Sequence, residues 1–342
     1  MTPNTVLAPM EPMIDREKTV SSTPMVSICP AEFSASSFWV HKLPSMSLEQ
    51  ENADLRCEVA RLQVLLAEYK LAVAKYISTD EGEIQEGVEG LKHCAKQGHT
   101  MATYYLAQAY FSGKGVPRDY AKSFQLFLQI MEKSPQACYM TGICYEEGKG
   151  VLPNTEYAFA CYYKAAEQGN IEACFSIGLC FENGTGTKLN RIKAREFYAK
   201  AAESGNTRAM YNLALMYFSM TNKEDTAIQW VTKAAELGLA SAQFTLGTCH
   251  KTGENVPIDC EKAAKYFKLG SQQNHVACLN ALANLYFRGE GVQRNIYKAI
   301  LLYQQSARLG HSGAVASINL CMKILHLEST SVSNSSSSSS VI

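Results

Sequence analysis

The sequence has no excess of charge of either sign, because its 342 residues include 32 basic and 32 acidic residues. Proteins that bind nucleic acids usually carry extra Lys and Arg to neutralise phosphates, so we expect no nucleic-acid partner. The sequence also lacks an apolar run of about 18 residues, which a membrane-spanning helix needs. Its N-terminus lacks the basic and apolar segments of a secretory signal. These absences predict a cytoplasmic protein with no direct membrane insertion.

Recognised catalytic motifs are absent as well. The sequence contains no G-x-x-x-x-G-K-[ST] phosphate loop, no H-E-x-x-H zinc motif, no G-x-S-x-G, and no Ser followed three residues later by Lys. The twelve cysteines include no C-x-x-C pair, and no cluster of Cys and His has metal-ligand spacing. The sequence therefore predicts a protein that is not an enzyme and has no catalytic residue, cofactor or metal site.

The sequence does contain a repeat. Residues 136–170 and 171–206 are two versions of one pattern, which continues in both directions. The first glycine of a loop marks the same place in most units, at Gly113, Gly148, Gly184, Gly253 and Gly289. A period of about 35 residues is typical of solenoids built from helical hairpins. We therefore predict six units over about 100–311, with a half unit at each end.

Each unit has two helical halves. In the first half, apolar residues such as Ala173, Ile177 and Phe181 recur every four positions, which places them on one face of a helix. Gly178 lies beside this face; because glycine costs about 1 kcal/mol in a helix interior, it indicates close approach of the partner helix. A Gly-x-Gly pair then ends the helix, and an Asp or Asn caps the next one. The predicted caps are Asp119, Asn154, Asn190, Asp259 and Asn295.

These residues resemble the Sel1-like repeat, a relative of the tetratricopeptide repeat. The family pattern is roughly A-x-aromatic-x-L-G-x-x-Y-x-x-G-x-G-V, then Asp or Asn, then K-A-x-x-Y-x-K-A-A-x-x-G. The resemblance implies an all-α fold, a right-handed α-α superhelix (solenoid) of about six repeats with half-repeat caps. We expect a heptad-patterned helix to precede it.

Four departures from the pattern are expected to change local geometry but not the fold. Unit four, residues 207–239, lacks the Gly-x-Gly loop, and Asn255 replaces the second glycine of unit five. Unit six is predicted to carry one extra residue in its first helix, with Cys278 in the alanine place. Unit one ends on Ser134 and Pro135 rather than on Gly-Asn.

The cysteines are interpreted as free thiols. Secreted, cysteine-rich bacterial members of the family pair cysteines eight residues apart, and no two cysteines here have that spacing. Instead, cysteines recur at equivalent places of different repeats, at Cys138 and Cys174 and at Cys144, Cys180 and Cys249. Such residues behave as small buried apolar groups, which fits a reducing compartment.

The chain is predicted to have four parts. Residues 1–46 are rich in Pro, Ser, Thr and Met and are expected to be disordered. Residues 47–78 form an amphipathic or coiled-coil helix, and residues 80–327 form the solenoid, whose incomplete end units seal its apolar face. Residues 328–342 form a Ser-rich tail that we expect to be disordered.

The helix at 47–78 carries a heptad pattern. Apolar residues and one Asn occupy its repeating positions, namely Leu48, Asn52, Leu55, Val59, Leu62, Leu66, Tyr69, Val73 and Tyr76. One interpretation is a parallel homodimer, in which Glu51 reaches Arg56 of the partner chain. The other is a helix that caps the solenoid of its own chain. Both remain open from the sequence.

By analogy with tetratricopeptide proteins, the first helices are expected to line a concave groove that binds peptides. Three rows of residues recur there. The first row is aromatic: Tyr104, Tyr139, Phe175, Tyr211 and Phe244. The second is Gln108, Ile143, Leu179, Leu215 and Thr248, and the third is Phe111, Glu146, Glu182, Phe218 and Lys251. An alternative for the aromatic row is that it only packs the repeats together.

The resemblance implies a non-enzymatic scaffold or adaptor whose partners are other proteins or peptides. A regulator of a partner enzyme or signalling complex is one narrower version. Alternatives are a hydrolase of the β-lactamase-like type and an activator of a membrane enzyme such as chitin synthase. The C-terminal Ser340-Val341-Ile342 also fits the tail that PDZ domains bind, although a serine tract gives this match easily.

Overall fold

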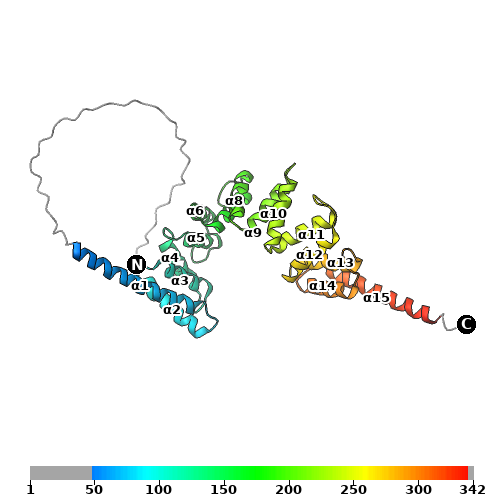
Figure 1. Cartoon of the computed structure of the whole chain (residues 1–342), viewed down its shortest axis with the longest axis horizontal. Helices are drawn as coiled ribbons and strands as arrows, with labels where there is room; N and C mark the ends of the chain where they lie inside the picture. Colours follow the sequence, from blue (N-terminus) through cyan, green and yellow to red (C-terminus); the bar gives the residue numbers. More distant parts are fainter. Residues whose placement is uncertain (1–47, 338–342) are drawn as a thin grey trace, which may run out of the picture. The chain divides into compact units, whose positions relative to one another are not determined.

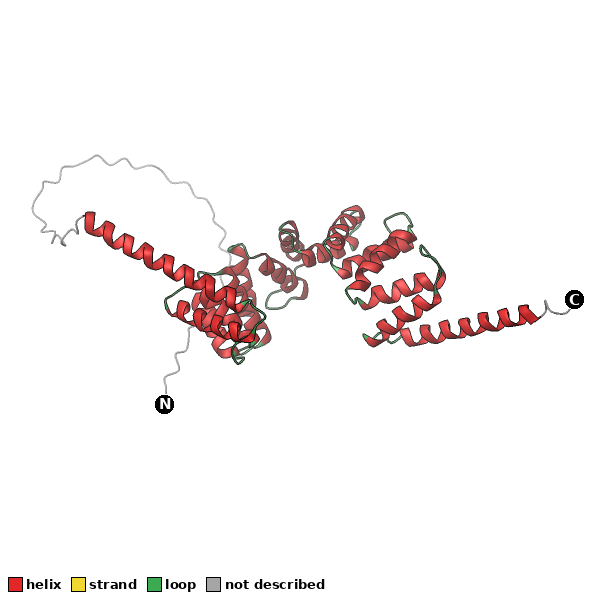
Figure 2. Ribbon diagram, turned by 60° about the horizontal axis from the view of Figure 1, so that its bottom comes forward, coloured by secondary structure: helices red, strands yellow, loops and turns green. Residues whose placement is uncertain are grey.

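The computed structural model describes residues 48–337, and within that range every regular element is an α-helix. Figures 1 and 2 show fifteen helices joined by short loops. The helices are α1 Leu48–Tyr76, α2 Glu81–Lys96, α3 Thr100–Ser112, α4 Tyr120–Ile130, α5 Pro135–Glu147, α6 Thr155–Glu167, α7 Ile171–Asn183, α8 Arg191–Glu203, α9 Thr207–Phe218, α10 Glu224–Glu236, α11 Ala240–Thr252, α12 Cys260–Gln272, α13 Val276–Arg288, α14 Ile296–Arg308 and α15 Ala314–Ser337. The predicted segment 1–46 and the last five residues lie outside the described residues.

From α3 to α14 the helices form six consecutive hairpins, each packed on its neighbours in sequence. The predicted all-α superhelical repeat fold is therefore confirmed. The predicted caps are confirmed too: the side chains of Asp119, Asn154, Asn190, Asp259 and Asn295 each accept a hydrogen bond from the backbone N–H three residues later. These bonds satisfy N–H groups that a helix start leaves unpaired.

Inside five of the six hairpins, a large ring of the second helix lies against a small residue of the first, and Val231 takes this place in unit four. A Cβ added to Gly178 would lie 2.5 Å from the ring of Tyr198, and one added to Gly142 would lie 2.6 Å from the ring of Tyr162. Both tyrosines are almost completely buried. The close approach expected from the helical glycines is therefore confirmed.

The hydroxyl groups of these two tyrosines reach the rim of the hairpin. Tyr162 Oη donates to Glu146 Oε2 at 2.5 Å, and Tyr198 Oη donates to Glu182 Oε2 at 2.6 Å. Burial, followed by the bonded carboxylate, raises the pKa of both hydroxyls well above the ordinary value of about 10. The two glutamates therefore hold the central ring of their own hairpin.

The second glycine of the loop connects one unit to the unit before it. A Cβ on Gly150 would lie 2.1 Å from the carbonyl oxygen of Tyr120, and one on Gly186 would lie 2.1 Å from that of Thr155. Tyr120 and Thr155 are the first residues of the preceding second helices. The loop backbone thus lies directly on the start of that helix, and any side chain at this place would separate the two units.

Unit four interrupts this arrangement. Helix α9 ends at Phe218 without a left-handed glycine, and α10 begins after Lys223, whose side chain makes no capping hydrogen bond. In unit five, Asn255 takes the place of the second glycine with φ at +62°. Asparagine adopts this conformation more readily than other residues with side chains.

The predicted extra residue in unit six is wrong. Helix α13 has thirteen residues, as do α11 and α7, and Cys278 stands third in its helix as Ala242 does in α11. The difference lies in the residue type alone. Cys278 is fully buried, and its sulfur would lie 2.3 Å from a Cβ on Gly270 of α12.

The two ends differ from the expected half units. At the N-terminal end, the second half of α1 supplies the first helix of a further hairpin with α2: Leu65, Ala72 and Tyr76 are buried with Val88 and Leu91. The seventh unit was expected to seal the C-terminal end, but it leaves Val315, Leu320 and Met322 of α15 more than half exposed. No second helix follows α15 within the described residues to cover them.

Helix α15 also runs beyond the expected boundary at 327. Its backbone is helical to Ser337, whereas residues from 328 onward were predicted to be disordered. Serine is only moderately unfavourable in helices, and extending an existing helix costs far less than starting one. The folded end of the preceding repeat therefore provides the start for a helix that the serine tract can continue.

Two glycines with similar backbones allow the loop contact to be tested. Gly186 and Gly205 have φ values of +68° and +95°, but only Gly186 has neighbours near an added Cβ. We expect Gly205→Ala to lower the free energy of unfolding by about 1–3 kcal/mol through backbone strain. Gly186→Ala should cost roughly 1–3 kcal/mol more because of the clash with Thr155. Equal losses in urea denaturation would contradict the assigned role of the contact.

The tyrosine pairs predict a dependence of stability on alkaline pH. Above about pH 10 the unfolded chain releases tyrosine protons that the folded chain retains. Because the two pKa values are raised in the folded state, the contribution of these tyrosines to the free energy of unfolding is constant below that pH. It falls as the pH rises further. We expect Tyr162→Phe/Tyr198→Phe to cost roughly 1 kcal/mol per lost hydrogen bond at neutral pH and to fall less steeply above pH 10. Phe267 stands at the equivalent place of unit five and shows that a ring without a hydroxyl group fits there. Parallel pH profiles of the wild type and the double variant would refute this account.

Candidate protein-binding surfaces

The first helices bring the three predicted rows together on consecutive hairpins. Helices α5 and α7 are linked by a contact of 3.4 Å between Tyr139 Oη and Ser176 Oγ. Helices α9 and α11 are linked by a contact of 3.2 Å between Tyr211 Oη and Thr245 Oγ1. Residues at equivalent places of these helices therefore follow one another along the solenoid, as the sequence predicted.

The aromatic row packs the hairpins together. Ring centroids lie 5.4 Å apart for Tyr139 and Tyr162, and 5.8 Å apart for Phe175 and Tyr198. Tyr104 lies 5.8 Å from Phe127 in the same way, and Phe244 lies 5.9 Å from Phe267. Phe175 is buried and the other members of the row are partly buried. The contacts of this row are therefore packing contacts within the repeats, as the alternative for the aromatic row expects.

The second and third rows include side chains that are more exposed than those of the first row, but several of their members make contacts within the chain. Leu215 is 44% exposed, and Ile143, Leu179, Phe218 and Lys251 are partly buried. Gln108, however, donates to Tyr104 Oη at 2.8 Å, and Phe111 lies 4.6 Å from the ammonium of Lys149. Glu146 and Glu182 hold the hydroxyls of Tyr162 and Tyr198. A change of either glutamate therefore affects packing as well as surface charge.

Helix α1 divides into two parts with different surroundings. Tyr69 stacks on His99 with centroids 4.2 Å apart, and Val73 packs in the cluster around Leu91. Lys75 forms an ion pair with Glu86 of α2 at 2.6 Å. These contacts support the interpretation of a cap for the last turns of α1. Tyr69 and Val73 are therefore partly covered by contacts within the chain.

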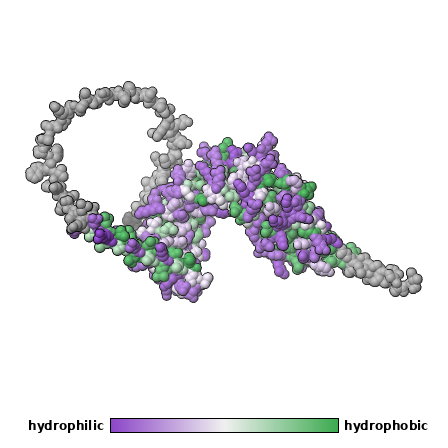
Figure 3. Space-filling model, viewed as in Figure 1, coloured by the Kyte–Doolittle hydropathy of each residue, from purple (hydrophilic) through white to green (hydrophobic). Residues whose placement is uncertain are grey.

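The earlier turns of α1 remain uncovered within the described residues. Leu55, Val59 and Leu62 are each more than half exposed, and Leu66 is 44% exposed. Figure 3 shows hydrophobic residues along this part of the helix. Asn52 is exposed too, and the side chain of Leu48 lies outside the described residues. The exposed seam is therefore Leu55, Val59, Leu62 and Leu66.

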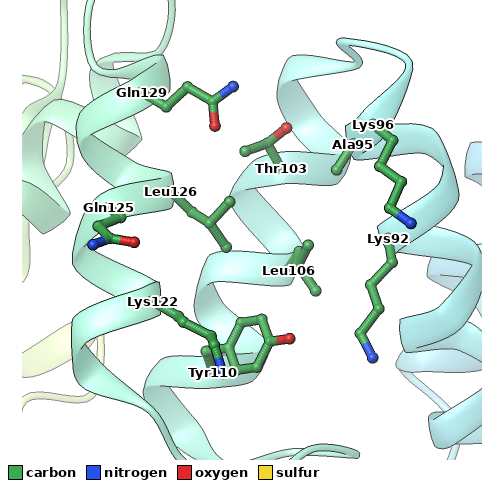
Figure 4. A pocket seen from close by; sticks show the side chains of 10 residues that line it. All are labelled: Lys92, Ala95, Lys96, Thr103, Leu106, Tyr110, Lys122, Gln125, Leu126 and Gln129. Carbon is green, nitrogen blue, oxygen red and sulfur yellow. The ribbon is translucent and has the colours of Figure 1, made fainter.

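An open pocket, not predicted from the sequence, lies between α2 and α4 above α3 (Figure 4). Its volume is about 520 Å³. The lining residues are Lys92, Ala95, Lys96, Thr103, Leu106, Tyr110, Lys122, Gln125, Leu126 and Gln129. Three lysines and no acidic residue line it. The signal in the sequence is the residue type at equivalent places of the second helices, where Lys96 stands at a place that holds Glu in three later units.

Among the described residues, no group of His, Cys, Asp and Glu is arranged to hold a metal ion. The eleven cysteines there are free; most are buried, whereas Cys57 is exposed. Burial raises the pKa of Cys144 to about 11 and that of Cys278 to about 12. No described helix combines the length and apolar character needed to cross a membrane.

Comparison with known proteins identifies the repeats. The model of the Sel1 repeat matches six segments, at residues 100–130, 135–170, 171–206, 207–239, 240–275 and 276–311. Among solved structures, a Sel1 repeat protein from Oxalobacter formigenes is 25% identical with a TM-score of 0.62, and the match covers 71% of this chain and 96% of that one. A protective antigen from uropathogenic Escherichia coli is also 25% identical, with a TM-score of 0.55 and coverage of 78% and 66%.

The curated relatives match over shorter regions. The rat DAP3-binding cell death enhancer 1 is 36% identical over 97 residues, which is 28% of this chain and 19% of the relative. The chitin synthase regulator SKT5 of Saccharomyces cerevisiae is 27% identical over 214 residues, 58% of this chain and 31% of the relative. The chain thus spans a third or less of the length of these relatives. The six matched segments cover more than half of the chain, which therefore belongs to the Sel1 repeat family.

Proposed function

We propose that this chain is a non-enzymatic adaptor that binds partner polypeptides along the exposed side chains of its first helices. The observation that carries the proposal is the series of six consecutive Sel1 repeats, because repeats of this kind typically mediate contacts between proteins. The names of its relatives support a regulatory role, since they include a chitin synthase regulator and a cell death enhancer that binds DAP3. We also propose, from the sequence, that it acts in the cytoplasm.

The second and third rows carry the partner specificity in this proposal. The first row is largely used for packing, whereas Leu215 offers apolar surface and Lys251 offers charge. Ile143, Leu179 and Phe218 add partly buried apolar surface beside them. Apolar anchors flanked by charged groups suit an extended or helical peptide. Glu146 and Glu182 contribute charge at the rim, although they also hold tyrosines.

The exposed seam of α1 provides a second contact, for which we propose another copy of this chain. Val59, Leu62 and Leu66 continue the heptad register of Leu55, and the charge pair of Glu51 with Arg56 of the other copy suits parallel helices. Because Tyr69 and Val73 are covered within the chain, the remaining seam is short and the dimer should be weak. Two linked binding surfaces would still raise avidity for a partner that carries two sites.

Regulation of a membrane enzyme is the second candidate function. The similarity to SKT5 over 214 residues favours it. In this version the partner in the groove is a segment of the enzyme. No observation favours the hydrolase alternative, and the PDZ-type contact proposed at Ser340-Val341-Ile342 falls outside the described residues.

The groove can be tested by placing a photo-crosslinking residue in the full-length protein at Leu215 of α9 and, as a control, at Leu301 of α14. Both side chains are exposed, by 44% and 64%, but only Leu215 belongs to the second row. We expect defined crosslinked partners from position 215 in the native host. The partner found should then lose at least about fivefold in affinity for Leu215→Glu, because a charge replaces an apolar anchor.

Glu146→Gln is the matched test of charge at the rim, since the amide oxygen still accepts the bond from Tyr162. The same partners captured from position 301, or an affinity that ignores Leu215→Glu, would rule out the groove.

The seam can be tested by sedimentation of the full chain over a range of concentrations. We expect a reversible monomer–dimer equilibrium that Leu62→Glu/Leu66→Glu shifts to monomer, because two charges enter an apolar seam. Val64→Glu/Leu71→Glu is the control, because both residues are exposed on α1 outside the seam. A wild-type chain that stays monomeric, or a dimer that the seam variant retains, would exclude this contact.

A further inference from the structure

The pocket between α2 and α4 combines positive charge with an apolar floor (Figure 4). Leu106, which is 6% exposed, lies beneath it, with Leu126 and Tyr110 partly exposed beside it. Lys92 and Lys96 of α2 form one wall, and Lys122 stands on the opposite wall with its ammonium 5.6 Å from the centre of the Tyr110 ring. A ligand here would meet cations at the rim and apolar groups at the floor.

Equivalent gaps between the other second helices carry a different charge pattern. Lys96 stands two residues before the repeat-ending Gly98, and the same place holds Glu167, Glu203 and Glu236 in later units. Gln129 stands ten residues after the cap Asp119, and that place holds Lys164, Lys200 and Lys233. The gaps between α6 and α8 and between α8 and α10 therefore hold a carboxylate and an ammonium at these two places, whereas the first gap holds the ammonium of Lys96 and the neutral Gln129.

The next gap, between α4 and α6, is filled by different side chains. Lys164 forms an ion pair with Glu132 across it. Tyr157, at the place of Lys122, lies with its ring 5.4 Å from that of Tyr145. Tyr163, at the place of Lys92, lies 6.1 Å from Phe197 in the gap that follows. In these two gaps rings and an ion pair thus take the space that remains open in the first gap.

The lysines of the pocket are held only by weak pairs. Lys92 pairs with Glu89 at 2.7 Å and Lys122 with Asp119 at 2.9 Å, each on or beside its own helix. The Glu89 side chain is 71% exposed, and exposed pairs of this kind contribute little stability. An incoming carboxylate can therefore replace Glu89 at small cost, and Lys96 is positioned to meet a second one.

We propose that this pocket binds an acidic peptide segment of a partner protein, with carboxylates on Lys92, Lys96 and Lys122 and an aliphatic side chain on Leu106 and Leu126. The volume of about 520 Å³ suits a few side chains of such a segment. A phosphorylated peptide is the less suitable ligand, because phosphate is usually held by forked Arg groups or by a helix N-terminus. The pocket has no Arg: Lys92 and Lys96 lie along the middle and end of α2, and Lys122 lies in the first turn of α4, where the side chain of Asp119 already caps the helix N-terminus.

This site is separate from the groove proposed above. Residues three or four apart share one face of a helix, so Thr103, Leu106 and Tyr110 lie on one side of α3. Tyr104, Gln108 and Phe111 lie on another side and belong to the three rows. The acidic segment would thus bind while the first helices hold a different part of the partner or another protein.

The test uses the full chain and a fluorescein-labelled decapeptide of alternating glutamate and leucine, with binding followed by fluorescence anisotropy. We expect saturable binding that Lys92→Glu/Lys96→Glu weakens by about tenfold or more, because attraction becomes repulsion. The matched control is Lys265→Glu/Lys268→Glu on α12, which makes the same charge change at exposed lysines outside the pocket. We expect it to remain within about twofold of the wild type, since long-range effects are screened at physiological salt.

Two further peptides separate the contribution of the carboxylates from that of the leucine side chains. Glutamine in place of glutamate should weaken binding as much as the pocket variant does, and serine in place of leucine should weaken it through loss of the floor contact. A phosphoserine peptide without leucine that binds more tightly, equal binding by the pocket variant, or no saturable binding by the wild type would overturn the proposal. Leu215→Glu should leave decapeptide binding unchanged, so failure of the groove and failure of the pocket are distinguishable. Unchanged circular dichroism of each variant confirms that it is folded.

Discussion

The structure depends on backbone contact between units that cannot bury their own apolar faces. The loops of units two, three and six lie against the first carbonyl group of the preceding second helix, as at Gly186 and Thr155. Each central ring lies against a small residue of its partner helix, as Tyr198 does against Gly178. Neither distance leaves room for a Cβ, so the spacing of helices within and between units follows from where side chains are missing. Nearest-neighbour contacts of this kind make a solenoid stable as a series rather than as one globular core.

The same constraint explains what could be predicted from the sequence. A glycine inside a helix or a Gly-x-Gly loop is unfavourable unless the backbone needs it, so its recurrence located the hairpins and their caps. Cys278 misled the prediction because a cysteine stood in the alanine place, and an inserted residue was invoked where only the side chain differs. The end of α15 was missed because a serine tract has little intrinsic preference, and the preceding folded helix determines its backbone.

The binding surfaces were predicted less completely. The rows on the first helices were found from periodicity, but periodicity could not show that Glu182 is bonded to Tyr198 or that the aromatic row is largely consumed by packing. The heptad pattern could not distinguish a cap from a seam, because successive turns of α1 have different surroundings: Tyr69 is stacked on His99, whereas Leu62 is exposed. The pocket arises from a change of charge between equivalent places and from rings that are absent, which only the packed arrangement makes visible.

The missing loop of unit four has a mechanical consequence. Without a Gly-x-Gly loop between α9 and α10, no glycine equivalent to Gly186 lies on the start of α8, and units three and four are joined by the packing of α8 on α9 and by the contacts of Glu172 with Asn206 and Arg208. In a linear array, cooperativity passes only through such junctions. Separation of the repeats at this junction is therefore opposed by side-chain contacts alone, whereas the loop backbones of Gly150, Gly186 and Gly291 also oppose it at other junctions.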